Sequence, residues 1–130
     1  NPNLACRPFD KDHDGFIYGE AWGVVVLEKA AHAQQRGVTS YGELIGWSHI
    51  LDGERGPKPS QKGEERAINA ALTMAKLQPE QIDYVNTHGT SSPMGDKTEV
   101  AALKCVGLSH CLINATKSLT GHCVTAAGMV

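Results

Sequence analysis

Two short apolar runs, residues 82–85 and 112–115, are each followed by a turn of small residues that carries a histidine. Short apolar runs bounded by such turns are typical of buried strands, and α/β proteins place their chemistry at the strand ends. His88 and His122 are therefore expected to project from neighbouring strand ends into one cleft. Two neutral imidazoles that converge can donate two N–H bonds to an oxygen gaining negative charge. The pattern indicates part of an enzyme site.

The remaining segments alternate between strand and helix signals. Apolar residues at helical spacing, with glycine or proline beyond the last turn, predict helices over residues 29–36, 64–76 and 96–105. A fourth helix is expected to begin near residue 124. Further strands are predicted over residues 23–27 and 41–50, the first buried on both faces, with a Gly- and Pro-rich loop over 51–62. This order predicts an α/β fold with a mostly parallel sheet.

The composition is that of a soluble α/β protein and excludes several classes of function. Of the 130 residues 41% are hydrophobic, and 12 basic against 14 acidic residues give a net charge of −2. Interspersed charges leave no basic surface for nucleic acid or an anionic membrane. The longest apolar stretch, residues 24–27, is far shorter than a membrane helix, and no secretory signal opens the chain. A cytoplasmic protein is expected, and the missing initiator methionine suggests a piece of a longer one.

The cysteines and acidic residues are compatible in principle with disulfides, a zinc site or a calcium site. The four cysteines are expected to be reduced, and their spacing from the histidines fits no zinc motif, so no metal is predicted. Residues 10–17 match the first eight positions of an EF-hand calcium loop. The twelfth position is Ala21 instead of a bidentate glutamate, and Pro8 interrupts the entering helix. An acidic turn is therefore predicted, with a calcium-loop module as the alternative.

Two motifs together carry a resemblance to a known family. Residues 88–93 read His-Gly-Thr-Ser-Ser-Pro and are followed by Asp96 and Glu99, and residues 116–122 read Thr-Lys-Ser-Leu-Thr-Gly-His. With the upstream segment 6–28, these motifs closely resemble a β-ketoacyl synthase over essentially the whole chain. The resemblance implies a thiolase-like α/β/α layered fold, present in part. Residues 1–60 would end the N-terminal half and connect it to an incomplete C-terminal half over 61–130.

The resemblance also implies a chemistry, the decarboxylative Claisen condensation of acyl and malonyl thioesters in polyketide or fatty-acid biosynthesis. The substrates would be carried on the phosphopantetheine of an acyl carrier protein, with no bound cofactor, and the parent protein would be a homodimer. His88 and His122 would stabilise the malonyl-derived enolate. Lys117 would pair near His122 and Glu99 and support the site electrostatically.

Several of these residues also have a purely structural interpretation. Asp96 and Glu99 would support the site, or would form a capping box at a helix start. Thr90 and Ser92 would contact the pantetheine arm, or would only close their turn through side-chain hydrogen bonds. Lys117 could instead be a solvated loop lysine. Four histidines match no catalytic motif and are assigned to the surface or the core: His13, His32, His49 and His110. Trp22 and Trp47 are expected to be packing residues.

The resemblance places the nucleophilic cysteine of the family upstream of these residues, so the 130 residues alone are expected to condense nothing. A cysteine there would make the parent a condensing enzyme. Serine or glutamine would leave a malonyl-carrier-protein decarboxylase of the same fold as the alternative. A non-catalytic partner subunit is a further alternative. The loop over 51–60 and Trp47 favour a polyketide pathway over fatty-acid synthesis.

Overall fold

The computed structural model describes residues 4–130 and combines short helices with a small parallel sheet. In chain order its elements are α1 (Ala30–Gln35), α2 (Gln61–Ala75), η2 (Pro79–Gln81), β1 (Tyr84–Asn86), α3 (Pro93–Cys105), β2 (Leu112–Asn114), α4 (Lys117–Thr120) and η3 (Val124–Gly128). The element order from α2 onward alternates helix and strand, as predicted. No helix within residues 4–130 has both the length and the apolar character needed to cross a membrane.

The β1–α3–β2 unit positions the two histidine turns. The strands β1 and β2 pair in parallel, with Val85 opposite Ile113 and Asn86 opposite Asn114. Because the strands are parallel and adjacent, the segments that follow them leave the sheet at the same edge. His88 follows β1, and α4 with His122 follows β2, so the predicted convergence has a topological basis.

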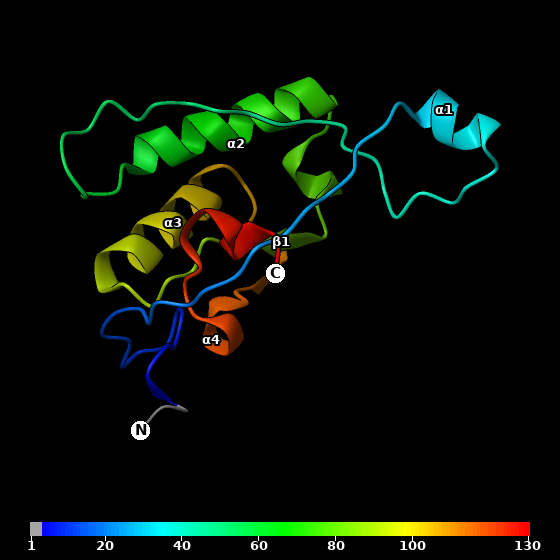
Figure 1. Ribbon diagram of the computed structural model, residues 1–130. Helices are drawn as coiled ribbons and strands as arrows, with labels where there is room; N and C mark the ends of the chain where they lie inside the picture. The colour runs from blue at the N-terminus through cyan, green and yellow to red at the C-terminus, as the bar shows by residue number, and fades with distance from the viewer. Residues whose placement is uncertain (1–3) are drawn as a thin grey trace.

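Helices α2 and α3 pack against each other over a small apolar core (Figure 1). The core consists of buried residues from the C-terminal part of α3 and the turn after it, with partners from α2, β1 and the residue that follows η2. Its buried members are Leu103, Val106, Leu108 and Cys111, and Ile68, Ile82 and Val85 pack against them. Burying this apolar stripe contributes more to the stability of the helices than their intrinsic propensity does.

Local capping explains where the two long helices begin and end. Ser60 accepts a hydrogen bond from the backbone N–H of Gly63 at 3.3 Å, so α2 begins at Gln61, three residues before the predicted start. The hydroxyl of Ser92 accepts a hydrogen bond from the backbone N–H of Gly95 at 3.4 Å and caps α3 in the same way. Lys76 ends α2 in the left-handed conformation, with φ of 57°. The predicted helix over 29–36 is confirmed as α1.

The two strands predicted upstream of α2 are wrong. Residues 23–27 form no strand, and four of their side chains are 61–87% exposed: Val24, Val25, Val26 and Leu27. Residues 41–50 are also non-strand, although Ser48 donates from its hydroxyl to the carbonyl of Ala67 on α2 at 2.7 Å. A strand needs a neighbour to satisfy its backbone, and residues 4–130 place none beside either segment. The predicted packing role of Trp22 and Trp47 is wrong for the same reason, because both are exposed.

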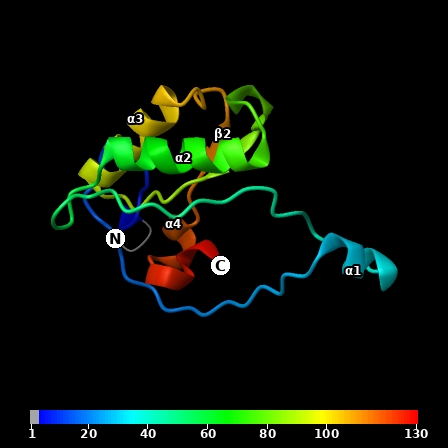
Figure 2. The ribbon, with the colours of Figure 1, turned by 90° about the horizontal axis from the view of Figure 1, so that it is seen from above.

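Figure 1 and Figure 2 both show α1 standing apart from α2 and α3, at the end of two long extended segments. Two smaller differences concern the C-terminal part of the chain. The turn predicted after residues 112–115 contains the single helical turn α4, and the helix expected near residue 124 is the 3₁₀ helix η3. Val124 has φ of 50°, outside the right-handed helical region, so no regular α-helix begins at this residue.

Candidate functional site

The structure brings His88 and His122 together. Their ring centroids lie 5.3 Å apart with an angle of 77° between the ring planes, an edge-to-face contact. His88 comes from the turn after β1 and His122 from the turn after α4, so one histidine follows each of the two paired strands. At this separation both imidazoles can reach a single small group placed between them.

Glu99 holds the backbone of the His88 turn. Its two carboxylate oxygens accept hydrogen bonds from the N–H of His88 at 2.7 Å and of Gly89 at 2.9 Å. Gly89 has φ of 35°, and a Cβ there would lie 2.5 Å from that of Ala115, so the turn requires glycine. Glu99 therefore acts on the main chain that carries the imidazole, a contact the sequence did not predict.

Asp96 is a buried carboxylate, 2% exposed, and holds the next part of the same turn. One of its oxygens accepts from the N–H of Thr90 at 3.0 Å and of Ser91 at 3.1 Å. Because Ser92 caps α3, both Asp96 and Glu99 lie inside the helix. The capping-box interpretation of this pair is therefore wrong, and both carboxylates instead bind the turn between β1 and α3.

Lys117 begins α4 and is 4% exposed, so the solvated-loop interpretation is wrong. Within residues 4–130 no carboxylate lies within 4.0 Å of its ammonium group, and the expected ion pair with Glu99 is absent. Its charge nevertheless reaches both rings. Lys117 lowers the pKa of His88 and the pKa of His122, in each case as a smaller effect than burial.

The surroundings of each imidazole favour its neutral form. Incomplete hydration in the cleft is the largest cause that lowers the pKa of His88, followed by Lys117, against weaker opposing effects of Glu99 and Asp96. For His122 the pKa is lowered first by burial, then by His88 and Lys117. A neutral imidazole carries one N–H donor. It can therefore donate to an anionic oxygen without first being protonated.

The His122 turn is held by the segment upstream of α1. The N–H of His122 donates to the carbonyl of Ile17 at 2.7 Å, and the N–H of Gly19 donates to the carbonyl of His122 at 3.2 Å. The ring of Phe16 meets the His122 ring edge to face at 5.3 Å. Residues 4–130 offer no hydrogen-bond partner to the buried Nδ1 of His122.

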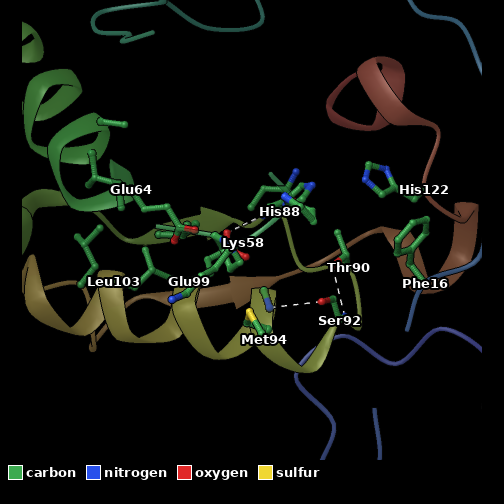
Figure 3. A pocket seen from close by; sticks show the side chains of 18 residues that line it. Phe16, Lys58, Glu64, His88, Thr90, Ser92, Met94, Glu99, Leu103 and His122 are labelled. Atoms are coloured by element: carbon green, nitrogen blue, oxygen red, sulfur yellow. Dashed lines mark hydrogen bonds between the residues drawn. The ribbon is translucent and has the colours of Figure 1, made fainter. Parts of the chain in front are cut away.

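Both histidines line a cleft of about 970 Å³ that continues between α2 and α3 (Figure 3). Thr90 and Ser92 lie on its wall. The Thr90 hydroxyl accepts from the N–H of Ser92 at 3.3 Å and the Ser92 hydroxyl caps α3, so both side chains close the turn as the structural interpretation expected. Their contact with a pantetheine arm stays a prediction.

Three residues near the site were missed by the sequence reasoning. His13 and Phe16 belong to the acidic turn, and their partners lie 83 and 106 positions away, at Asp96 and His122. Glu64, in the first turn of α2, lines the same cleft. Burial, and next the charge of Glu99, raises the pKa of Glu64 to about 7. The only sequence signal for Glu64 was its place at the start of an amphipathic helix.

Two carboxylates of the acidic turn over residues 10–17 bind groups that are close by in the sequence. Asp10 accepts from the N–H of Asp12 at 2.8 Å, and Asp14 lies 3.6 Å from the guanidinium of Arg7. In the part of the chain that the structure describes, no three His, Cys, Asp or Glu side chains gather as metal ligands. The four cysteines there are free thiols, and Cys111 donates to the carbonyl of Ile82.

Comparison with known proteins places this geometry in context. The model of the β-ketoacyl synthase C-terminal domain matches residues 41–130, and that of the N-terminal domain matches residues 1–33. The chain is 54% identical over 129 residues to the polyketide biosynthesis malonyl-ACP decarboxylase PksF of Bacillus subtilis, covering 99% of this chain and 31% of that protein. It is 43% identical over 135 residues to 3-oxoacyl-[acyl-carrier-protein] synthase 2 of Vibrio cholerae, covering 99% and 33%.

Solved structures give the same result. The ishigamide ketosynthase/chain length factor superposes with a TM-score of 0.91 at 36% identity, over 96% of this chain and 31% of that one. A ketosynthase in complex with its type II polyketide synthase acyl-carrier protein superposes with a TM-score of 0.89 at 34% identity, over 98% and 32%. The chain thus spans about a third of the length of the relatives it matches, and the predicted α/β, thiolase-like fold class is confirmed.

Proposed function

Because the chain belongs to the β-ketoacyl synthase family, we propose that the protein containing it decarboxylates a malonyl thioester and joins the product to an acyl group. This is the decarboxylative Claisen condensation of polyketide or fatty-acid biosynthesis. The observation that supports it most is the contact of the His88 and His122 rings, 5.3 Å apart at one end of the cleft. The sequence motifs and the family membership agree with this assignment.

The two imidazoles act on the thioester carbonyl. When the malonyl carboxylate leaves as carbon dioxide, its bonding electron pair passes to the α-carbon and is delocalised onto the carbonyl oxygen. The N–H groups of His88 and His122 donate to that oxygen as it becomes negative, and so lower the barrier. The lowered pKa of both rings keeps them neutral, and Lys117 contributes to this. Two neutral donors hold the enolate without protonating it.

The neighbouring residues position these donors. Glu99 binds the backbone N–H of His88 and Gly89, and Asp96 binds those of Thr90 and Ser91. Donors that are already in place do not have to reorient when charge develops on the substrate. Water molecules would have to reorient, so fixed donors lower the barrier more. The cleft continues past Thr90 and Ser92, whose hydroxyls lie on the wall along which a pantetheine arm would run.

Condensation also requires a thiol that carries the acyl group. Within residues 4–130 none of the cysteines lines the cleft: Cys6, Cys105, Cys111 and Cys123 all lie elsewhere. The proposal therefore requires a nucleophile outside these residues, and the 130 residues alone are expected to condense nothing. An acyl carrier protein is the proposed partner, by analogy with the ketosynthase complex above. A homodimer and a cytoplasmic location belong to the same proposal.

Malonyl-carrier-protein decarboxylation without condensation is the second candidate. It is favoured by the 54% identity to a malonyl-ACP decarboxylase, against 43% to a condensing enzyme. The two reactions share the step that His88 and His122 assist and differ only in the fate of the enolate. In condensation the enolate attacks an acyl thioester, and in decarboxylation alone the enolate takes up a proton. A non-catalytic partner subunit would have no use for two neutral imidazoles in one cleft.

The experiment is a product analysis with the intact protein. Malonyl-acyl carrier protein is supplied with and without an acyl donor, and carbon dioxide and the carrier-bound products are measured by mass spectrometry. A β-ketoacyl product that needs the acyl donor identifies a synthase, and an acetyl product under both conditions identifies a decarboxylase. Absence of carbon dioxide release by the intact protein would contradict both candidates.

A further inference from the structure

The acidic turn that resembles a calcium loop is part of a longer segment, residues 9–19, which joins the two histidine turns. We call this segment the strap. One end of the strap lies on Asp96, beside the His88 turn, and the other end lies on the His122 turn. Its ten peptide bonds add a second connection between two loops that follow the paired strands β1 and β2.

At its first end the strap supplies hydrogen bonds to the carboxylate of Asp96. The N–H of Phe9 donates to one carboxylate oxygen at 2.8 Å, and His13 Nδ1 lies 3.0 Å from the same oxygen. A carboxylate only accepts, so His13 carries the proton of this hydrogen bond. The other oxygen is the one that holds Thr90 and Ser91. One buried carboxylate therefore binds the strap on one side and the His88 turn on the other.

Backbone conformation at this end shows that the arrangement is held under constraint. Phe9 and Ser91 have φ of 64° and 70°, in the left-handed region that bulky residues avoid. Both donate their N–H to Asp96, and the hydroxyl of Ser91 also accepts from the N–H of Arg7 at 3.0 Å. Non-glycine residues keep such conformations only where their surroundings enforce them, and functional sites are where these residues gather.

At its second end the strap forms a backbone bridge to His122. Tyr18 pairs with His122 in parallel, through Ile17 and Gly19. A Cβ on Gly19 would lie 2.9 Å from the sulfur of Cys123 and closer still to the carbonyl oxygen of Thr120, so the two backbones meet without room for a side chain. Phe16, from the same strap, packs against the His122 ring.

We propose that the strap sets the spacing of His88 and His122, and that His13 is a positioning residue that acts through Asp96. This rests on the proposed function, because it assigns the strap to the step that the two imidazoles assist. His13 does not line the cleft, so the role proposed for it runs through Asp96 and not through contact with substrate. Without its N–H, the buried Asp96 oxygen keeps only Phe9 as a donor, and the strap is anchored to the His88 turn by a single hydrogen bond.

The test compares His13 variants of the intact protein in malonyl-carrier-protein decarboxylation. In His13→Phe, which keeps a ring and removes the donor, we expect kcat to fall about tenfold or more, because a small misplacement of catalytic groups has effects of that size. KM should change less than about threefold, since the cleft wall is intact. His13→Gln restores an N–H donor and should recover most of kcat. The matched control is His32→Phe, on the exposed helix α1.

A second variant tests the other end of the strap. Gly19→Ala introduces the clash with Thr120 and Cys123 and should also lower kcat, whereas Gly42→Ala, whose Cβ meets nothing within 4 Å, should not. If His13→Phe fails to fold, Gly19→Ala decides the outcome. An unchanged kcat in a folded His13→Phe or Gly19→Ala protein overturns the strap proposal. The proposed function fails separately, if His88→Ala retains decarboxylation.

Discussion

Glu99 binds the backbone N–H of His88 at 2.7 Å, so α3 is tied directly to the turn that carries the first imidazole. The resemblance to the family implied a different arrangement, an ion pair of Glu99 near Lys117, and that pair is absent from residues 4–130. The two charged residues have separate tasks. Glu99 positions the main chain, and Lys117 supplies a positive field at both rings.

Substitution of Glu99 by glutamine tests its positioning role. The amide keeps one acceptor oxygen and replaces the other with a donor, which faces the N–H of His88 or of Gly89. We expect the free energy of unfolding to fall by about 1 kcal/mol, because a part-buried or exposed N–H loses its acceptor and meets a second donor. Thermal unfolding of the intact protein measures the loss of stability, and kcat measures the effect on the position of His88. Glu80→Gln, on an exposed residue, is the control, and equal losses in both variants would contradict the assignment.

Lys117→Met removes the buried charge and keeps the length of the side chain. Lys117 lowers the pKa of His88 and His122, so its loss raises both values and each ring takes up a proton at a higher pH. The acidic limb of the decarboxylation rate should therefore shift to higher pH, since a protonated ring would give its proton to the enolate. A pH profile measures the shift, with the exposed Lys104→Met as control. An unmoved acidic limb would show that the field of Lys117 does not reach the rings.

Glu64 gives a pH dependence of stability with a defined sign. The pKa of Glu64 is raised from 4.5 to about 7, so the folded protein binds this proton more tightly than the unfolded chain does. Ionisation of Glu64 therefore destabilises the folded state. This destabilisation is absent below pH 4.5, grows between about 4.5 and 7, and is complete above 7. Glu64→Gln should therefore raise Tm at pH 8 and leave it unchanged near pH 4. A Tm gain of the same size at both pH values would contradict the shifted pKa.

The turn glycine beside His88 allows a steric test. A Cβ at Gly89 would lie 2.5 Å from that of Ala115 and 2.9 Å from the hydroxyl of Thr87, so Gly89→Ala must move the turn that Glu99 holds. Overpacking of this kind costs about 1–3 kcal/mol in stability, and the displaced ring should lower kcat as well. Thermal unfolding and initial rates measure the two effects. Gly42→Ala, in open space, serves as the reference, and a wild-type kcat in Gly89→Ala would show that the turn tolerates displacement.

The sequence predicted the elements whose signals are local. Helix α2 has an apolar stripe and the cap Ser60, and α3 ends before Gly107, so both lie within a few residues of their predicted positions. Residues 23–27 were misassigned because an apolar run becomes a strand only where a neighbouring strand pairs with it. Residues 4–130 place none there, and the side chains are exposed.

The long-range part of the site could not be predicted in the same way. The motifs identified His88 and His122, because each motif surrounds its own histidine in sequence. The contact of His13 with Asp96 joins residues 83 positions apart, and no local pattern distinguishes it from a surface histidine. The same holds for Phe16 and His122. The sequence therefore identified the two histidines of the candidate site, and the structure was needed to find the residues that contact their turns.

The most direct measurement of the central claim is carbon dioxide release from malonyl-carrier protein by the intact protein and its His88→Ala, His122→Ala and doubly substituted variants. The proposal assigns both rings to one oxygen, and on that basis we predict that each single substitution lowers kcat by about 100-fold or more. The double substitution should be less severe than the product of the two single effects, since the two donors act as a unit. Decarboxylation at near wild-type rates in either single variant would contradict the account.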